Sequence, residues 1–336
     1  MMRRAVVVLL ALAGVAHGDD FGDATIIFQR GAALYRVTAT GKSESQLATL
    51  PAKSTVRAMR TDAAGTILLA DIGGEWSYLK LDGQATTLTP LPCGAGPAQL
   101  AEDGSCVVCK AAQGDGSIIY NFAVGKPYPV DVPAGARLVG EAADRTLVWA
   151  DSSGIWGAKP GKLAAKKQLA PAPPLRGFLA SPDGSRAVGV YAGEVFESIK
   201  KKTPGDVFTI FALDGTAARR RLGALAMPLE WSHDGSYVLV QTDTTACLVG
   251  ASGGEYKCWR GFTAASLSPD GRWGLLYGTG KPAEKPTTKT DADVPLAAPS
   301  GSSSLYRARL EGAYTDKPTL LVKSVDGAAV WVPKHP

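Results

Sequence analysis

The chain has 336 residues, of which 45% are hydrophobic and 20% are charged, so a sizeable core is possible and wholesale disorder is excluded. Glycine (39) and proline (22) are frequent and histidine (3) is scarce, which favours a turn-rich β protein over metal or histidine chemistry. The formal net charge of +5 is mild for this length and gives no nucleic-acid signature.

Residues 1–18 have the layout of a secretory signal peptide. Arg3 and Arg4 precede an apolar run over 5–13, and the small residues Ala16 and Gly18 precede a cleavage point. The apolar run is too short to span a bilayer, and no cysteine follows it that would accept a lipid. We therefore expect a cleaved signal peptide and a periplasmic or secreted protein without a transmembrane segment. An uncleaved N-terminal anchor is the alternative.

A turn motif recurs along the chain with a period of 36 to 63 residues. Its clearest copies are Ser-Pro-Asp-Gly at 181–184 and 268–271 and Ser-His-Asp-Gly at 232–235, each between two apolar runs. Aspartate can bond the following backbone and glycine accepts a positive φ, so each copy predicts a tight turn between strands. Two further strand-like runs follow each copy, which makes the repeat a four-stranded unit. Degenerate copies stand at 62–65, 101–104 and 141–144.

The first strand of each unit gives the number of units. These strands start near Val56, Ala98, Arg137, Gly177, Pro228, Ala265 and Ala328. The N-terminal unit has only three strands, over 24–28, 34–38 and 45–49, while 328–332 is a lone strand at the other end. Adding the lone strand to those three completes a unit and closes a ring, which protects the edge strands. The sequence therefore predicts one all-β domain over 19–336, a seven-bladed β-propeller, with six blades as the alternative.

The Ser-Pro-Asp-Gly element resembles the WD40-like repeat of TolB-type propellers and of the propellers that precede peptidase domains in prolyl oligopeptidase relatives. The resemblance is clear at 181–184 and 268–271 and weaker at 232–235. It implies the fold and says little about function, because the element is a structural turn. TolB-type proteins carry an additional N-terminal α/β domain. Here strands are expected within a few residues of Asp19, so that domain is missing and a Tol–Pal role does not follow.

The five cysteines suit an exported protein, because oxidation is possible outside the cytosol. Cys247 and Cys258 flank a glycine-rich hairpin turn, and a turn centred on 252–253 sets them opposite each other, so a cross-strand disulfide is predicted. Two reduced cysteines are the alternative. For the other three, we expect a Cys93–Cys109 disulfide with Cys106 free. The spacing of Cys106 and Cys109 puts them on opposite faces of a strand, and no histidine is near, which argues against zinc.

Two long loops, 191–206 and 279–303, are expected on the face opposite the Asp-Gly turns, and such lengths are uncommon unless functional or disordered. The first mixes aromatic and charged residues, as interaction surfaces do, although a solvated loop is the alternative. In the second, Asp291 and Asp293 lack the pattern of a calcium loop. The candidate binding residues in the first loop are Tyr191, Glu194, Phe196, Glu197, Lys200, Lys201 and Lys202.

Three charged residues of the inner strands, Arg137, Arg176 and Glu230, are expected near the mouth of the central channel. His233 takes the place of the proline in its sister turns. The Gly-x-Ser-x-Gly pattern at 250–254 joins two strands, whereas a nucleophile elbow joins a strand to a helix. Repeats of about 43 residues leave no room for a hydrolase domain. We therefore expect no catalytic residue, no metal and no cofactor.

The sequence thus favours a non-catalytic, exported, monomeric propeller of a bacterial envelope. It would act as a TolB-like platform that binds an envelope or secreted protein or a ligand, and not nucleic acid. The alternative is a lactonase-type or other hydrolytic propeller enzyme that uses channel-mouth residues and a bound cation. A purely structural envelope component is a third hypothesis.

Overall fold

The computed structural model describes residues 24–81, 86–114, 116–130, 132, 136–141, 146–175, 177–198, 201–214, 219–222, 227–242, 245–252, 256–278, 302–310 and 317–333. The predicted signal peptide, Arg176, Lys200 and nearly all of the predicted loop 279–303, with Asp291 and Asp293, lie outside these residues.

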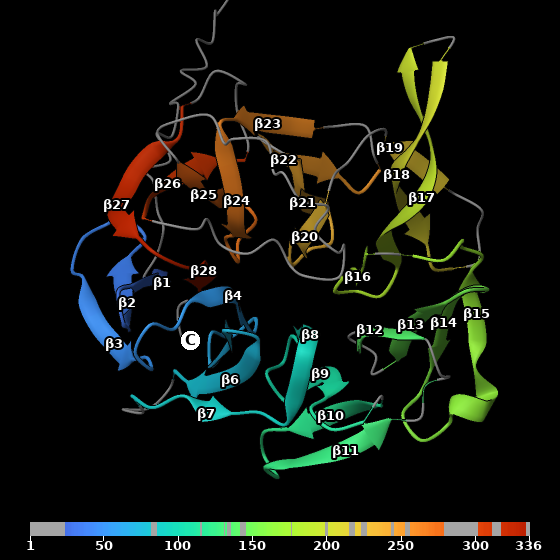
Figure 1. The fold of residues 1–336 in the computed structure, drawn as a ribbon, viewed down its shortest axis with the longest axis horizontal. Helices are drawn as coiled ribbons and strands as arrows, with labels where there is room; N and C mark the ends of the chain where they lie inside the picture. The colour runs from blue at the N-terminus through green and yellow to red at the C-terminus, as the bar shows by residue number, and fades with distance from the viewer. Residues whose placement is uncertain are drawn as a thin grey trace, which may run out of the picture.

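Seven four-stranded antiparallel sheets are arranged around a common centre (Figure 1). The prediction of a seven-bladed β-propeller is therefore confirmed, and the six-bladed alternative is wrong. The described residues contain no α-helix, only the 3-10 turn η1 (Leu163–Ala165), and none of their helices is long and apolar enough to cross a membrane.

The blades are numbered here in chain order, each from its inner to its outer strand. Blade 1 contains β28 (Ala329–Val332), β1 (Thr25–Arg30), β2 (Ala33–Thr38) and β3 (Ser45–Thr49). Blade 2 contains β4 (Val56–Thr61), β5 (Ile67–Ile72), β6 (Glu75–Lys80) and β7 (Thr89–Pro90). Blade 3 contains β8 (Cys93–Leu100), β9 (Cys106–Ala111), β10 (Ser117–Asn121) and β11 (Lys126–Val130).

The remaining blades follow the same order. Blade 4 contains β12 (Arg137–Glu141), β13 (Leu147–Asp151), β14 (Gly154–Ala158) and β15 (Lys167–Ala170). Blade 5 contains β16 (Gly177–Ala180), β17 (Arg186–Ser198), β18 (Lys201–Ala212) and β19 (Arg219–Leu222). Blade 6 contains β20 (Met227–Trp231), β21 (Tyr237–Thr242), β22 (Thr245–Gly250) and β23 (Tyr256–Arg260). Blade 7 contains β24 (Phe262–Leu267), β25 (Trp273–Gly278), β26 (Ser303–Arg309) and β27 (Thr319–Val325).

Blade 1 is built from both ends of the described chain. β28 pairs antiparallel with β1, so that Ile26 lies opposite Trp331 and Ile27 opposite Val330. All four side chains are buried. The predicted ring closure is thereby confirmed, and β1 has a hydrogen-bonded neighbour on each side.

The Ser-x-Asp-Gly turns share one hydrogen-bonding scheme. In the turn of blade 6, Ser232 Oγ donates to Asp234 Oδ1 at 2.6 Å and accepts from the Tyr237 N–H at 3.0 Å. Gly235 has a φ of 66°, which a glycine adopts without steric cost. Burial opposes ionisation of Asp234, but the hydrogen bonds from Ser232 and Ser236 outweigh it and lower the pKa of this carboxyl. The turn joins the first strand of a blade to the second and is called the A–B turn below.

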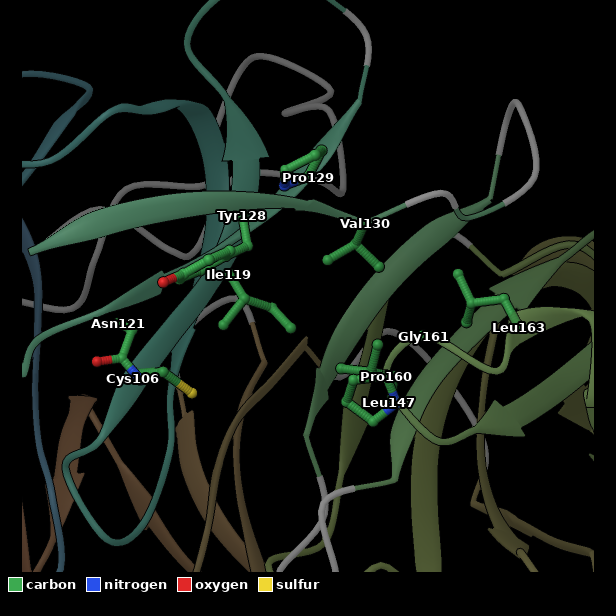
Figure 2. A pocket seen from close by; sticks show the side chains of 10 residues that line it. All are labelled: Cys106, Ile119, Asn121, Tyr128, Pro129, Val130, Leu147, Pro160, Gly161 and Leu163. Carbon is green, nitrogen blue, oxygen red and sulfur yellow. The ribbon is translucent and has the colours of Figure 1, made fainter. Parts of the chain in front are cut away.

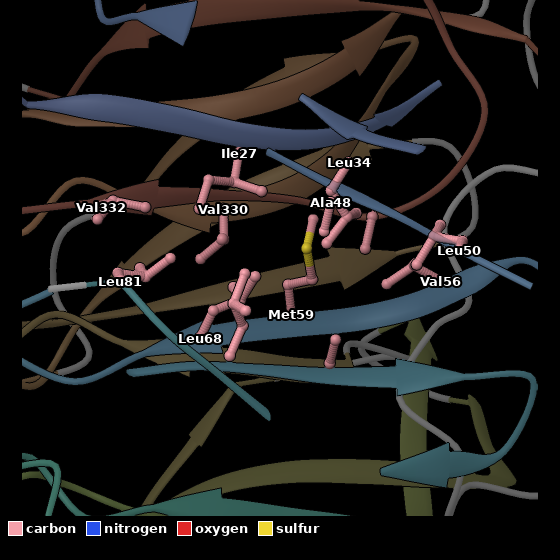
Figure 3. Packing of buried hydrophobic residues seen from close by; sticks show 13 residues of the cluster. Ile27, Leu34, Ala48, Leu50, Val56, Met59, Leu68, Leu81, Val330 and Val332 are labelled. Carbon is pink, nitrogen blue, oxygen red and sulfur yellow. The ribbon is translucent and has the colours of Figure 1, made fainter. Parts of the chain in front are cut away.

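Neighbouring blades pack through the apolar side chains on their facing surfaces. Between blades 1 and 2, Ile27 and Val330 meet Met59 and Leu68 in a buried cluster (Figure 3). Comparable clusters join blades 2 and 3, 4 and 5, 5 and 6, 6 and 7, and 7 and 1. Because strand side chains alternate between faces, an inner strand of a blade can contribute to both neighbouring interfaces, as β28 does with Val330 and Trp331. The core is thus a series of interblade layers.

Both predicted disulfides are present. Cys247 lies directly opposite Cys258 on β22 and β23, with the Cα atoms 4.1 Å apart. Cys93 and Cys109 join β8 to β9 with a Cα–Cα distance of 5.7 Å, and Cys106 is buried and belongs to neither of the two disulfides. Each bond links neighbouring strands within one blade.

The segment 191–206 was expected as a loop, and the structure corrects this prediction. β17 and β18 continue past the blade as a two-stranded ribbon, with Tyr191 opposite Val207 and Ser198 opposite Lys201. The register runs without interruption from Arg186 and Ala212 at the blade to Phe196 and Lys202 near the tip. The hairpin of the blade therefore simply lengthens, and its backbone groups pair with each other instead of with water.

We predict that removing residues 329–336 abolishes cooperative unfolding. The change deletes β28 and with it the buried side chains of Val330, Trp331 and Val332, each worth about 1.5–3 kcal/mol of burial, against a typical total stability of about 5–15 kcal/mol. Urea unfolding followed by tryptophan fluorescence measures this. Removing only 334–336 is the control, because it leaves β28 complete. A truncated chain as stable as the control would contradict closure by β28.

Candidate functional site

A cavity of about 130 Å³ lies at the end of the central channel that the A–B turns border. We call it the channel cavity. Its lining comes from blades 1, 2, 3, 5, 6 and 7, whose inner strands surround the centre of the ring (Figure 1). The polar and aromatic residues that matter most among its lining are Arg60, Gln99, Glu102, Glu230, His233 and Trp331.

Two residues at the same place in the turn repeat meet across the channel. Glu102 and His233 are each the second residue of an A–B turn, in blades 3 and 6, and Pro182 and Pro269 hold this place in blades 5 and 7. His233 Nδ1 lies 3.5 Å from Glu102 Oε1. The hydrogen bond with Glu102 is the main cause that raises the pKa of His233, against the opposing effect of burial. This pair bridges opposite sides of the ring.

Arg60 and Glu230 form the second charged group in the channel cavity. Arg60 Nη2 donates to the Leu229 carbonyl of blade 6 at 3.4 Å, and Glu230 Oε2 accepts from the Leu267 N–H of blade 7 at 2.8 Å. Burial raises the pKa of Glu230, although the Leu267 N–H, Arg60 and His233 all act against this rise. Burial likewise lowers the pKa of Arg60, while Glu230 favours its charged form. The cavity therefore brings together a guanidinium, an imidazole and two carboxyls, of which His233 and Glu102 are partly exposed.

Of the three residues expected at the channel mouth, the structure describes the side chain of Glu230 alone. Glu230 is the fourth residue of β20 and borders the cavity beside the A–B turn, not at the start of the strand. Arg137 is the first residue of β12, and Arg176 lies outside the described residues. Sequence reasoning missed Arg60, Gln99 and Glu102. An alignment of the turns would have paired Glu102 with His233.

The ribbon carries the other predicted binding residues. Tyr191 lies at its base, where Thr209 Oγ1 donates to the Tyr191 hydroxyl at 3.4 Å, and Glu194 is exposed further out. Phe196, Glu197, Lys201 and Lys202 belong to its paired strands, whereas Lys200 lies outside the described residues. β16 pairs with β17 only up to Val190, and β19 pairs with β18 only from Phe208 on. Among the described strands, none pairs with either edge of the ribbon between these limits, and it extends beyond the ring (Figure 1).

A larger cavity of about 430 Å³ lies between blades 3 and 4 (Figure 2). Ile119, Tyr128 and Val130 face it from blade 3, and Leu147 and Leu163 face it from blade 4. Its lining is mainly apolar, with the thiol of Cys106, the amide of Asn121 and the hydroxyl of Tyr128 as polar exceptions. Such a lining offers dispersion contacts and no acid–base pair.

The described residues hold no group of three or more His, Cys, Asp or Glu side chains placed to bind a metal ion.

Known proteins resemble this chain in fold. No protein-family model and no curated protein matches it. A putative 6-phosphogluconolactonase from Bacteroides fragilis aligns over 94% of this chain and 99% of its own, with 12% identity and a TM-score of 0.52. The dihydro-heme d1 dehydrogenase NirN, solved in complex with DHE, aligns over 92% of this chain and 75% of its own, with 14% identity and a TM-score of 0.52.

TolB is also among the structural neighbours. TolB from Acinetobacter baumannii aligns over 94% of this chain and 68% of its own, with 12% identity and a TM-score of 0.47. At such identities the likeness is one of fold alone. Proteins of different kinds share this architecture, so the function has to be argued from the channel cavity and the ribbon.

We predict that the stabilisation by His233 depends on pH. The pKa of His233 is raised above its ordinary 6.5, so its contribution is complete below that pH and is lost as the pH rises through the folded-state pKa. His233→Gln should therefore cost more stability at about pH 5.5 than at about pH 8.5. Both partners are partly exposed, so the difference should stay below about 1 kcal/mol. Urea unfolding of both proteins at the two pH values measures it, and a cost independent of pH would contradict the Glu102 pair.

Proposed function

We propose that this protein is a non-catalytic, exported binding platform that captures a partner protein through its ribbon. The partner would supply an extended segment that pairs with an edge of the ribbon. The observation that carries this proposal is the pairing pattern of blade 5, where β17 and β18 continue together beyond the last residues that β16 and β19 pair with.

The chemistry of strand edges supports this mode of binding. An unpaired edge presents alternating N–H and C=O groups, and a partner strand satisfies them with main-chain hydrogen bonds. A two-stranded ribbon by itself is marginally stable in water, so a third strand would also stabilise it. The exposed Glu194 and the aromatic Tyr191 at the base offer side-chain contacts that discriminate between partners.

Export is supported by two independent features. Residues 1–18 have the layout of a signal peptide, and two disulfides join neighbouring strands. Disulfides persist in oxidising compartments and are rare in the cytosol. The proposal therefore places the partner in the bacterial envelope or outside the cell, as for a TolB-like platform.

We predict that deleting Glu194–Pro204 abolishes partner capture while the melting temperature stays nearly unchanged. Gly193 lies opposite Gly205, so the deletion leaves a Gly-Gly pair between the facing residues Ala192 and Asp206. Two glycines suit the two-residue turn that closes a hairpin, and the blade itself is untouched. Crosslinking followed by a pull-down from the cell envelope measures capture, with an expected loss of at least about tenfold, the signature of about 1.4 kcal/mol or more.

The matched control for this deletion is Val124→Ser in the β10–β11 turn, another exposed site on a different blade. It should capture the same partner as the unchanged protein. If the shortened ribbon captures the partner as well as the control does, the ribbon is not the binding surface.

A second candidate function, a hydrolytic enzyme, is favoured by one observation at the channel cavity. Glu230 has a raised pKa in a desolvated space that also holds His233 and Arg60, and such environments are used by catalytic acids. In this hypothesis Glu230 donates a proton to a leaving group, Arg60 stabilises negative charge, and a bound cation assists. A putative 6-phosphogluconolactonase is a neighbour in fold.

Under the leading proposal, the protein hydrolyses lactones and activated esters no faster than buffer does, with or without added calcium. Turnover of a lactone panel, followed by pH-stat titration, measures this. Turnover that Glu230→Gln reduces by about a hundredfold or more, within the usual range for a general acid, would instead establish the enzyme. Thermal stabilisation of the protein by calcium would likewise favour the enzyme over the binding platform.

A further inference from the structure

The residue that directly follows the third strand of a blade recurs as an apolar contact between blades. In six blades its N–H donates to the carbonyl of the residue just before the second strand, as Leu81 does to Thr66 at 2.7 Å. Its side chain belongs to the apolar layer that its blade shares with the preceding blade. We call it the C–D residue, because it opens the turn from the third strand to the fourth. The six are Ala39, Leu81, Phe122, Leu213, Ala251 and Leu310.

Blade 4 has a lysine at this position. Lys159 directly follows β14 and is exposed, whereas five of its six counterparts are buried and Ala251 is half-buried. An ammonium group loses its hydration in an apolar layer, so Lys159 does not supply the buried apolar group that the other blades supply. Among the side chains that the structure describes, no buried apolar cluster joins blades 3 and 4.

The cavity of about 430 Å³ lies in this same layer, and we call it the interblade cavity. Pro160 and Gly161, the two residues after Lys159, line it from blade 4, and Ile119 and Tyr128 face them from blade 3 (Figure 2). The cavity thus adjoins the one C–D residue that is charged. Its volume falls within the range of about 300–1,000 Å³ that is typical of small-molecule sites.

The interblade cavity can be reached from solvent. Val130 and Leu147 in its lining are buried, whereas Tyr128 in the same lining is 48% exposed. Val124, in the turn of the same β10–β11 hairpin, is 55% exposed. A solvent-accessible cavity with apolar residues at its rim is a common feature of ligand sites.

The lining selects the kind of ligand. It includes no charged side chain among the described residues, so an ionic ligand would lose its hydration without gaining an ion pair. An uncharged apolar ligand instead gains from leaving water. The aromatic ring of Tyr128 favours a second aromatic ring, because such pairs contribute beyond the area that they bury.

We propose that the interblade cavity binds an uncharged aromatic molecule of about two fused rings. The ligand takes the place that the C–D side chain fills in the layers between other blades. The site shares no lining residue with the channel cavity, and the ribbon belongs to blade 5. It therefore does not depend on the proposed capture of a partner protein.

The test uses the full protein and three probes that differ mainly in charge. They are 2-naphthalenemethanol, which is neutral, 2-naphthoate, which is an anion, and 2-naphthylmethylammonium, which is a cation. Isothermal titration calorimetry at neutral pH and constant ionic strength gives their affinities. We expect the neutral alcohol to bind at least about tenfold more tightly than either ion, because the lining offers no counter-charge.

Variants of Tyr128 locate the bound probe. Tyr128→Ser removes the ring and should weaken binding of the alcohol about tenfold, whereas Tyr128→Phe keeps the ring and should leave binding unchanged. The matched control is Leu320→Ser in β27 of blade 7, which also removes an exposed apolar side chain and should bind normally. Melting temperatures within a few degrees of the unchanged protein show that each variant is folded.

A variant of the C–D residue tests whether the ligand takes its place. Lys159→Leu introduces the residue that blades 2, 5 and 7 have at this position, as Leu81, Leu213 and Leu310. It should lower the affinity for the alcohol about tenfold without lowering the melting temperature. Lys159→Arg keeps the charge and is the control, with unchanged binding expected.

The proposal is overturned if the alcohol does not bind, or if all three probes bind equally. It is also overturned if Tyr128→Ser binds the alcohol as well as Leu320→Ser does, or if Lys159→Leu binds it as well as Lys159→Arg does. The Glu194–Pro204 deletion should bind the alcohol normally, and loss of binding there would contradict a site between blades 3 and 4.

Discussion

The pairing of β28 with β1 is the contact on which the rest of the structure depends. Without it, blade 1 lacks its inner strand, and the layers that join blade 1 to blades 2 and 7 lose Val330, Val332 and Trp331. A toroid has no single core, so every interblade layer relies on the ring being closed. Closure also sets the radius of the ring and therefore decides which side chains meet across it. The channel cavity is a consequence of that radius.

The second organising feature is the A–B turn, which serves both fold and site. In blades 5, 6 and 7 its serine and aspartate bond each other and the following backbone, which stabilises the turn locally. Its second residue borders the channel, where proline is replaced by Glu102 in blade 3 and by His233 in blade 6. A substitution at this second turn residue therefore changes the side chain that borders the channel. The strand pairing of the blade does not depend on that side chain.

The two candidate sites offer different chemical groups to a ligand. The ribbon offers backbone groups along an edge, which suits an extended polypeptide. The channel cavity is small and sets charged side chains among apolar ones. Because the second-to-third strand connections and the A–B turns lie at opposite ends of the blades, occupation of one site leaves the other open.

By itself, the sequence determined the blade repeat, the closing strand and the Cys247–Cys258 disulfide, and it favoured seven blades over six. These follow from local rules: aspartate and glycine specify turns, turns set strand register, and register places Cys247 opposite Cys258. Only the tertiary structure decided that 191–206 is a paired ribbon, because strand pairing depends on facing backbone groups and not on segment length. It alone also brought Arg60, Gln99 and Trp331 to one cavity. These residues are far apart in sequence and meet only because a closed ring of fixed radius brings their blades together.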